Sequence, residues 1–295
     1  MRLEVAAAKW AVDRPRDFAT FAHRVGSEVA AAAAGGARLL VLPEYLSLEL
    51  AATFEPAVYA DLHASLAALQ RYRGDWLDLF AGLARRHDLY LLAGTFLLDT
   101  GQGRYRNRAD LFTPAGTHLW QDKLQLTGFE QGTGVIEPGD RLKVFDLDGL
   151  RVGIAICYDI EFPLPVRAQR EAGARLLLVP SCTDTAAGAT RVRVGCLARA
   201  LENRSYVLQS VTAGEAPWSP ALDVNTGEAA VYAPMDVDLP PDGIIASTAA
   251  GGTRVHASLD FDLLENSRVR AQVGVDHDWP GQLRPGLVRA TVGSG

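Results

Sequence analysis

The chain has 295 residues, of which 48% are hydrophobic and 22% are charged, and its formal net charge is −6. A chain of this length and composition folds as a globular protein with a large core. The negative charge argues against a nucleic-acid partner, which needs a clustered basic surface. No apolar run approaches the roughly 20 residues of a membrane span.

Short apolar runs alternate with helical patterns along the chain, which predicts an α/β fold. The predicted helices cover residues 17–34, 62–70, 75–87, 165–172 and 190–203. The predicted strands cover residues 3–8, 38–42, 89–96, 109–112, 118–123, 144–146, 151–156, 175–179, 205–212, 228–232, 243–247 and 254–260. Several strands are apolar throughout, so we expect both of their faces to be covered.

The chain also repeats itself. ARLLVLPEY at 37–45 matches ARLLLVPSC at 174–182, and HDLYLLAGT at 87–95 is matched by NRSYVLQSV at 203–211 in the same order. Two internally duplicated halves, each a mixed sheet with outer helices, predict a four-layer αββα sandwich. We expect one domain over residues 1–265. Residues 266–295 lack periodicity and are predicted to form a C-terminal tail that contacts the body or a neighbouring subunit.

The cysteines indicate a reducing environment. Three of them, without a CxxC spacing, argue against a disulfide framework or a zinc site and favour a cytoplasmic protein. The apolar run at the N-terminus is too short for a signal peptide. Since no metal-binding spacing and no phosphate loop occurs either, we expect neither a metal nor a cofactor.

Three polar residues stand where predicted strands end. Glu44 follows RLLVLP, Lys123 follows THLWQD, and Cys157 follows VGIAI. Taken singly, they are explained as a turn cap, a surface lysine and a buried core thiol. Catalytic groups of α/β folds collect at strand ends, however, and a thiol with a carboxylate base and a cation is sufficient for acyl transfer.

Three motifs carry a family resemblance. VLPEY at 41–45, WQDKLQL at 120–126 and GIAICYDIEFP at 153–163, in this order, resemble the signatures of the nitrilase superfamily of carbon–nitrogen hydrolases. The similarity covers roughly residues 1–265. It implies a four-layer αββα sandwich that hydrolyses a non-peptide carbon–nitrogen bond of a small molecule. The bond would be an amide or N-carbamoyl bond, cleaved through a cysteine thioester with release of ammonia or an amine.

The resemblance also implies roles for individual residues. Glu44 would be the general base, Cys157 the nucleophile, and Lys123 the cation that stabilises the tetrahedral intermediate. The backbone N–H of Tyr158 would complete the oxyanion hole. A second glutamate supports the site in this family; Glu130 is our candidate.

Other positions concern support and specificity. Glu137 is the alternative to Glu130, although it precedes a Pro-Gly turn. Two positions depart from the family pattern: Gln125, where many relatives have histidine, and Glu161, where many have arginine. We expect a salt bridge from Glu161 to Arg167 or Arg199, or a contact with a cationic substrate. Our candidates for the substrate pocket are Tyr45, Glu161, Ser181, Cys182, Thr183 and Trp218.

Alternative functions remain open from the sequence. The same triad could hydrolyse a nitrile or transfer an acyl group to an acceptor other than water. In a different class, the chain could be a catalytically silent binding or scaffold subunit. The resemblance implies a homodimer or a higher homo-oligomer whose partner molecule is a small amide-type substrate.

Overall fold

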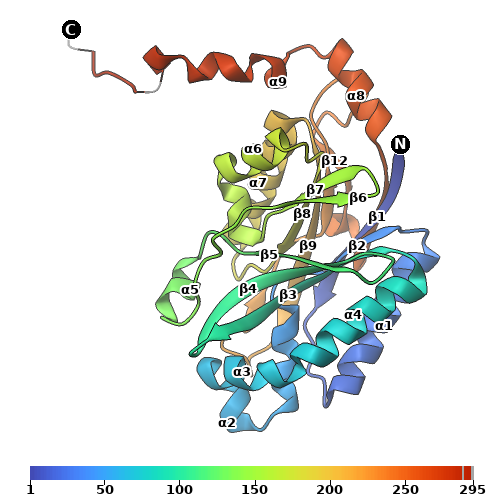
Figure 1. Ribbon diagram of the computed structural model, residues 1–295, viewed down its shortest axis with the longest axis vertical. Helices are drawn as coiled ribbons and strands as arrows, with labels where there is room; N and C mark the ends of the chain where they lie inside the picture. The colour runs from blue at the N-terminus through green and yellow to red at the C-terminus, as the bar shows by residue number, and fades with distance from the viewer. Residues whose placement is uncertain (288, 294–295) are drawn as a thin grey trace.

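The computed structural model describes residues 1–287 and 289–293, and most of its strands belong to two sheets (Figure 1). The first sheet has the spatial order β5 (His118–Asp122), β4 (Arg104–Phe112), β3 (Tyr90–Gly101), β2 (Leu39–Val41), β1 (Arg2–Ala11) and β13 (Arg254–Asp260). Strands β1, β2 and β3 are parallel, and the remaining pairs are antiparallel.

The second sheet repeats this plan. Its strands are β6 (Val144–Leu147), β7 (Leu150–Ile154), β8 (Leu176–Ser181), β9 (Tyr206–Glu215), β11 (Ala230–Tyr232) and β12 (Ile244–Ser247), and the short β10 (Val224–Asn225) pairs with the end of β9. Again the central strands, β7, β8 and β9, are parallel. Residues 9–11 of β1 pair in parallel with residues 211–213 of β9 and join the two sheets.

Helices cover the outer faces of both sheets (Figure 1). Helices α1 (Phe18–Ala34) and α4 (Arg73–His87) lie on the first sheet, and α6 (Pro163–Glu171) and α7 (Ala186–Asn203) lie on the second. Side chains of β1 alternate accordingly: Ala6 and Ala8 pack with the α1 and α4 core, whereas Val5 and Ala7 belong to the core shared with the second sheet. The predicted αββα sandwich with duplicated halves is confirmed.

Several short elements were not predicted. They are the 3₁₀ helix η1 (Leu46–Thr53), helix α2 (Pro56–Tyr59), helix α5 (Gly128–Gly132) and strand β10. Each spans too few residues to show a hydrophobic period. Strands β3 and β4 are also longer than predicted, because their hairpin continues past the apolar runs, through residues of mixed polarity, to a turn at Gly101 and Gly103, which both have positive φ.

The predicted boundary between domain and tail falls inside a helix. Helix α8 (Phe261–Arg270) starts directly after β13, is capped by the Asp260 side chain, and buries Phe261 and Leu264 in the core. Beyond it, α9 (Val275–Asp278) contacts α7, and the ring of Trp279 in the 3₁₀ turn that follows lies 4.1 Å from the Arg167 guanidinium of α6. The chain then continues toward its C-terminal end, apart from the sheets (Figure 1). The predicted tail is therefore partly helical; its residues 288 and 294–295 lie outside the described residues.

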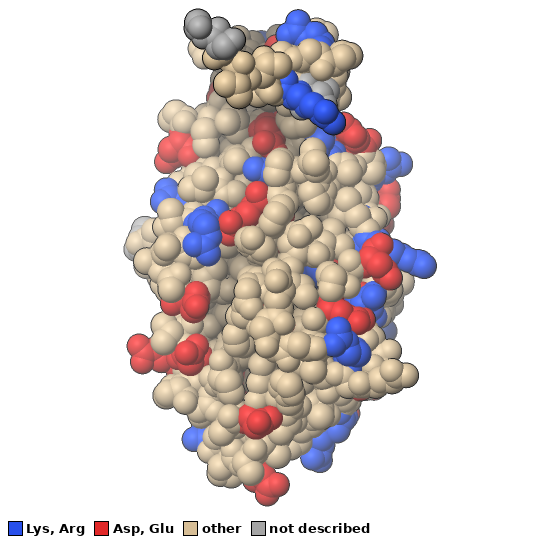
Figure 2. All heavy atoms as spheres, turned by 90° about the vertical axis from the view of Figure 1, so that its left-hand side faces the viewer, with Lys and Arg blue, Asp and Glu red and all other residues tan. Residues whose placement is uncertain are grey.

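The surface view in Figure 2 shows acidic and basic side chains scattered over one face. This face has no basic stripe of the kind that follows a nucleic-acid backbone. Among the described residues, no helix combines the length and apolarity needed to cross a lipid bilayer.

Candidate active site

Glu44 is placed by a close approach between two strands. The chain leaves β2 with Leu42 N–H bonded to the carbonyl of Leu92 on β3 at 2.9 Å. Gly94 of β3 has a φ of +72°, and a Cβ at this position would collide with the carbonyl oxygen of Pro43. Glycine therefore lets the Pro43-Glu44 turn lie directly on β3. From β9, the Thr212 hydroxyl donates to the Glu44 carbonyl at 2.7 Å.

Lys123 and Asn107 reach Glu44 from the β4–β5 hairpin. Lys123 follows β5 and its backbone N–H bonds to the carbonyl of Asn107 on β4 at 2.8 Å. The Nζ of Lys123 lies 2.8 Å from Glu44 Oε1 and 2.8 Å from Glu130 Oε2. The Nδ2 of Asn107 donates to Glu44 Oε1 at 2.8 Å and to Glu130 Oε1 at 3.1 Å. All four side chains are buried.

Glu130 enters this cluster from the short helix α5. Thr127 caps that helix, and the Thr127 N–H donates to Glu130 Oε2 at 3.0 Å. The Tyr45 hydroxyl donates to Glu130 Oε1 at 2.8 Å. Glu137, the alternative, forms an ion pair with Arg106 at 3.1 Å outside the cluster. The structure thus brings Glu130, and not Glu137, beside Glu44 and Lys123.

Cys157 occupies a strained turn after β7. It begins the 3₁₀ helix η3 (Cys157–Glu161) and has a φ of +50°, a left-handed conformation that is costly for a side chain other than glycine. Its Sγ is buried and lies 3.4 Å from the Cys182 carbonyl oxygen. The N–H of Tyr158 lies in the first turn of η3, where N–H groups have no partner within the helix.

Asp159 ties this turn to the segment after Lys123. Its carboxylate accepts the N–H of Ile156 at 3.0 Å, of Leu124 at 3.1 Å and of Gln125 at 2.7 Å. Burial raises the pKa of Asp159 to about 7. Asp159 and Asn107 were not predicted as site residues. Asn107 lies two residues before the predicted strand 109–112, so the predicted hairpin did not include it, whereas β4 begins at Arg104.

The charges of the cluster are strongly coupled. Burial raises the pKa of Glu44 and raises that of the Cys157 thiol well above its usual value, and Glu44 adds to the second effect. Burial opposes the charge of Lys123, but the carboxylates of Glu44 and Glu130 outweigh it and hold the Lys123 pKa well above its usual value. Burial is likewise outweighed at Glu130, whose pKa is lowered by Lys123. In the resting site the thiol is therefore neutral and Lys123 is charged.

A cavity of about 360 Å³ opens over this cluster. Glu44, Lys123 and Tyr45 form part of its lining, together with Cys182, whose thiol donates to Asn225 Oδ1 at 3.0 Å. Asp184, Arg191 and Asp223 contribute charged side chains, and Phe129 and Val224 contribute exposed apolar ones. Volume, polar groups and a buried charged cluster together are typical of a small-molecule site.

Comparison with known proteins decides the family. Residues 4–251 match the model of the carbon-nitrogen hydrolase family. The chain belongs to this family. It is an enzyme of the carbon–nitrogen hydrolase class, and the resemblance of the three motifs to the nitrilase superfamily is confirmed.

Individual relatives agree with this assignment. The probable hydrolase YhcX of Bacillus subtilis is 30% identical over 274 residues, which are 92% of this chain and 52% of that protein, so the chain spans about half of its length. An omega-amidase of Xenopus laevis is 27% identical over 252 residues and 83% of each chain. The crystal structure of Saccharomyces cerevisiae Nit3 superimposes with a TM-score of 0.73 over 92% of this chain and 95% of that one, at 21% identity, which shows the shared fold.

Four of the predicted pocket residues of this carbon–nitrogen hydrolase are engaged elsewhere. Ser181 Oγ donates to the Ser210 carbonyl at 2.7 Å inside the core, and Thr183 Oγ1 donates to the Thr226 carbonyl at 2.6 Å. Trp218 packs edge-on against Tyr59. Glu161 pairs with Arg191 at 3.2 Å, so the predicted pairing with Arg167 or Arg199 is wrong; these arginines pair with Glu171 and Glu202 on their own helices. Of the six candidates, Tyr45 and Cys182 line the cavity, and Glu161 acts on it through Arg191.

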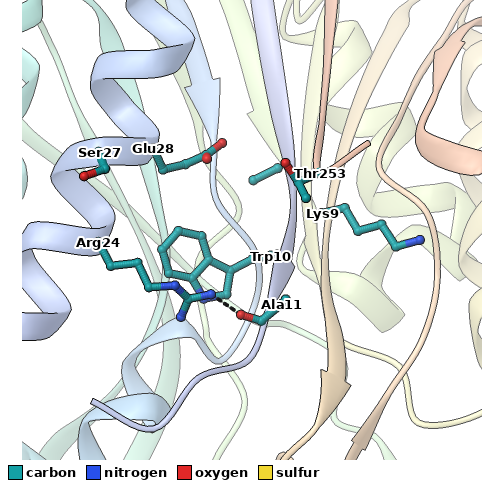
Figure 3. A pocket seen from close by; sticks show the side chains of 8 residues that line it. Lys9, Trp10, Ala11, Arg24, Ser27, Glu28 and Thr253 are labelled. Atoms are coloured by element: carbon teal, nitrogen blue, oxygen red, sulfur yellow. Dashed lines mark hydrogen bonds between the residues drawn. The ribbon is translucent and has the colours of Figure 1, made fainter. Parts of the chain in front are cut away.

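A second cavity of the hydrolase, of about 290 Å³, lies between β1 and α1 (Figure 3). The Arg24 guanidinium lies 4.0 Å from the ring centroid of Trp10, donates to the Ala11 carbonyl and pairs with Glu49 at 3.0 Å. The other charged side chains of this cavity are also paired, since Lys9 pairs with Glu228 at 2.8 Å and Glu28 pairs with Arg254 at 2.7 Å. Because these charges are neutralised by their partners, the cavity attracts a charged ligand only weakly.

Proposed function

We propose that this carbon–nitrogen hydrolase cleaves the amide or N-carbamoyl bond of a small molecule through a thioester on Cys157. The observation that carries the proposal is the buried cluster in which Lys123 contacts Glu44 and Glu130 at 2.8 Å each. Glu44 also interacts with the Cys157 side chain, and Glu44 and Lys123 line a cavity of substrate size. Nucleophile, base and cation are the groups that acyl transfer to sulfur requires.

The first half-reaction forms the thioester. Glu44 takes the proton of the Cys157 thiol while the sulfur attacks the carbonyl carbon. The carbonyl oxygen becomes an oxyanion, held by the Lys123 ammonium group and the N–H of Tyr158. Glu44 then gives its proton to the nitrogen as the carbon–nitrogen bond breaks, and ammonia or an amine leaves.

The second half-reaction restores the enzyme. Glu44 takes a proton from water, and the hydroxide attacks the thioester carbon. As the carbon–sulfur bond breaks, the thiolate recovers the proton from Glu44 and the carboxylic or carbamic acid leaves. Glu130 stays ionised throughout, because its pKa is held low beside Lys123.

A substrate panel tests the proposal. Purified protein is incubated with matched carboxamides, N-carbamoyl compounds and nitriles, and released ammonia is measured, with Cys157→Ala as the blank. We expect turnover of amides or carbamoyl compounds and an acyl adduct on Cys157 in the intact-protein mass spectrum. Full activity of Cys157→Ala would refute the thioester, and a preference for nitriles would change the substrate class.

We further infer that the protein is cytoplasmic and forms a homodimer or higher homo-oligomer through the C-terminal tail. Its three cysteines are free thiols, which suits a reducing compartment. In the tail, Val269 is 88% exposed, and Val273, Leu283 and Leu287 are also exposed, so a second copy would bury apolar surface there. Light scattering on the full chain and on a chain ending at residue 271 gives the number of subunits in each assembly. The same number for both chains would contradict this role of the tail.

A further inference from the structure

Two buried glutamates share one lysine in the active site, yet only one of them can serve as the base. Glu44 and Glu130 each contact Lys123 Nζ at 2.8 Å. Two carboxylates so close repel each other, and one cation does not by itself decide which of them accepts the proton. Something else in the site must distinguish them.

The hydrogen bonds distinguish the individual oxygen atoms. Both oxygens of Glu130 are occupied: Oε1 accepts from Tyr45 and Asn107, and Oε2 contacts Lys123 and the Thr127 N–H. On Glu44, Lys123 and Asn107 both bind Oε1, at 2.8 Å each. Within the described residues, Oε2 of Glu44 receives no such bond from N–H or O–H donors. It is the one carboxylate oxygen of the pair left for a proton.

Asn107 is the neutral member of this arrangement. Its single Nδ2 group bridges Glu44 Oε1 and Glu130 Oε1, so it separates the carboxylates without adding charge. Its position follows from strand pairing, because the Lys123 N–H bonds to the Asn107 carbonyl across the hairpin. The opposite orientation of the amide would aim Oδ1 at two carboxylates. Oδ1 instead is buried and unpartnered in the described structure, which indicates that contact with the glutamates decides the orientation.

We propose that Asn107 is a positioning residue that assigns the two glutamates their roles. By holding Oε1 of Glu44 together with Lys123, it presents Oε2 to the thiol and favours the ionised form of the base. The inference rests on the proposed function of Glu44 and Cys157. The ionisable groups that act on Glu44 from the surrounding elements are Lys123, Glu130, Cys157, Tyr45 and Cys182.

Removing the bridge should therefore move the pH dependence of the base. Without the Asn107 hydrogen bond the Glu44 carboxylate is less stabilised, so its pKa rises. In Asn107→Leu we expect the acid limb of kcat/KM to move up by about one pH unit and the plateau kcat to fall about tenfold, since hydrogen bonds to charged groups are worth that much. KM at the plateau should change little. Asn107→Asp adds a third carboxylate and should move the limb further.

The control is Asn203→Leu. Asn203 on α7 is likewise buried, donates to the Arg199 carbonyl at 3.1 Å and has an unpartnered Oδ1, but it lies outside the cluster. A purely structural role predicts that both variants lose thermal stability and neither shifts the acid limb. Unchanged limbs in folded Asn107→Leu and Asn107→Asp would overturn the proposal. Asn107→Asp is nearly isosteric, so it provides the test if the leucine variant fails to fold.

A second measurement separates this inference from the proposed function. The rate of Cys157 alkylation by iodoacetamide as a function of pH reports proton transfer to Glu44 without any turnover. If wild-type protein hydrolyses no amide, the proposed function fails, but an alkylation profile that shifts upward in Asn107→Leu still supports the role of Asn107. If amides are hydrolysed and both profiles stay unshifted, the role of Asn107 is refuted.

Discussion

Asp159 accepts the backbone N–H of Gln125 at 2.7 Å, and this bond connects the turn that begins at Cys157 to the segment that carries Lys123. The same carboxylate also binds the N–H groups of Leu124 and Ile156. One buried carboxylate thus links the backbone beside Lys123 to the backbone beside Cys157. Gln125 takes part through its backbone, so the departure from histidine at this position leaves the connection intact.

Asp159→Asn is expected to reduce kcat more than it raises KM. An amide nitrogen in place of one oxygen would face a backbone N–H, which leaves a donor unsatisfied and costs about 1–3 kcal/mol of stability. Steady-state kinetics on an amide substrate and chemical denaturation measure the two effects. A variant with wild-type kcat and only reduced stability would contradict the positioning of Lys123 by Asp159.

The activity of the wild-type enzyme should fall in acid with an apparent pKa above that of an ordinary glutamate. Burial raises the pKa of Glu44, and the proposed mechanism needs Glu44 ionised to accept the thiol proton. Activity is therefore absent below the raised pKa and develops as the pH rises through it. A kcat/KM profile on a neutral amide measures the limb. An acid limb at or below the ordinary glutamate pKa would show that Glu44 is not the limiting base.

Glu49 should make the fold less stable as the pH rises. This side chain accepts the Trp10 indole N–H at 2.7 Å and pairs with Arg24, and burial raises its pKa to about 7 from an ordinary 4.5. A carboxyl with a raised native pKa binds more protons in the native state, so its stabilisation is complete below pH 4.5 and is lost as the pH approaches 7.

The comparison with Glu49→Gln isolates this effect. Between these two pH values the wild type should lose about 3 kcal/mol of unfolding free energy relative to the variant, as an order of magnitude. Urea denaturation of both proteins at a series of pH values measures the difference. A difference that does not change with pH would mean that the Arg24 ion pair keeps the pKa of Glu49 near its ordinary value.

The charge of the cavity predicts a preference among substrates. Lys123 is already held by two glutamates and Arg191 pairs with Glu161, whereas Asp184 and Asp223 add carboxylates to the lining. The potential over the site is therefore negative. We expect amides with a cationic group away from the scissile bond to have a higher kcat/KM than anionic amides of the same length.

Asp184→Asn and Asp223→Asn should reduce the preference for cationic over anionic amides, because each removes a negative charge from the cavity. Glu161→Gln should also reduce it, because the positive charge of Arg191 would no longer be neutralised. Leu164→Ala, an exposed position on α6, is a surface control. The measurement is kcat/KM for cationic, neutral and anionic amides of one length at two salt concentrations, since screening weakens the effect. An anionic amide that remains the best substrate would contradict the expectation.

The residues of the candidate site could be located from the sequence because they stand at strand ends. Each of Glu44, Lys123 and Cys157 follows an apolar run. The repeated order of these runs along the chain predicted two halves, each with its own sheet. The sequence did not show which way each side chain points at a strand end. Ser181 and Cys182 are adjacent, yet alternation along the chain turns Ser181 into the core and Cys182 toward the cavity. A prediction from strand ends alone treats both as pocket residues.

The missed features depend on register or on short elements. Asn107 matters only because β4 pairs with β5 in the register that places it beside Lys123. Helix α5 has five residues, two of them glycine, and is held by the Thr127 cap rather than by an apolar stripe. In α8, two buried side chains near its start, Phe261 and Leu264, were too few to indicate a helix.

The pairing of β1 with β9 has a consequence for inactivation. Glu44 and Lys123 come from the first half of the duplication and Cys157 from the second, so neither half holds all the groups of the proposed mechanism. Residues 9–11 and 211–213 pair directly across the join between the two halves. A slip of one residue there, about 3.3 Å, would part the base from the thiol while both sheets stayed folded. Turnover in this enzyme therefore depends on the alignment of its two halves. We expect heating to abolish turnover before it abolishes secondary structure.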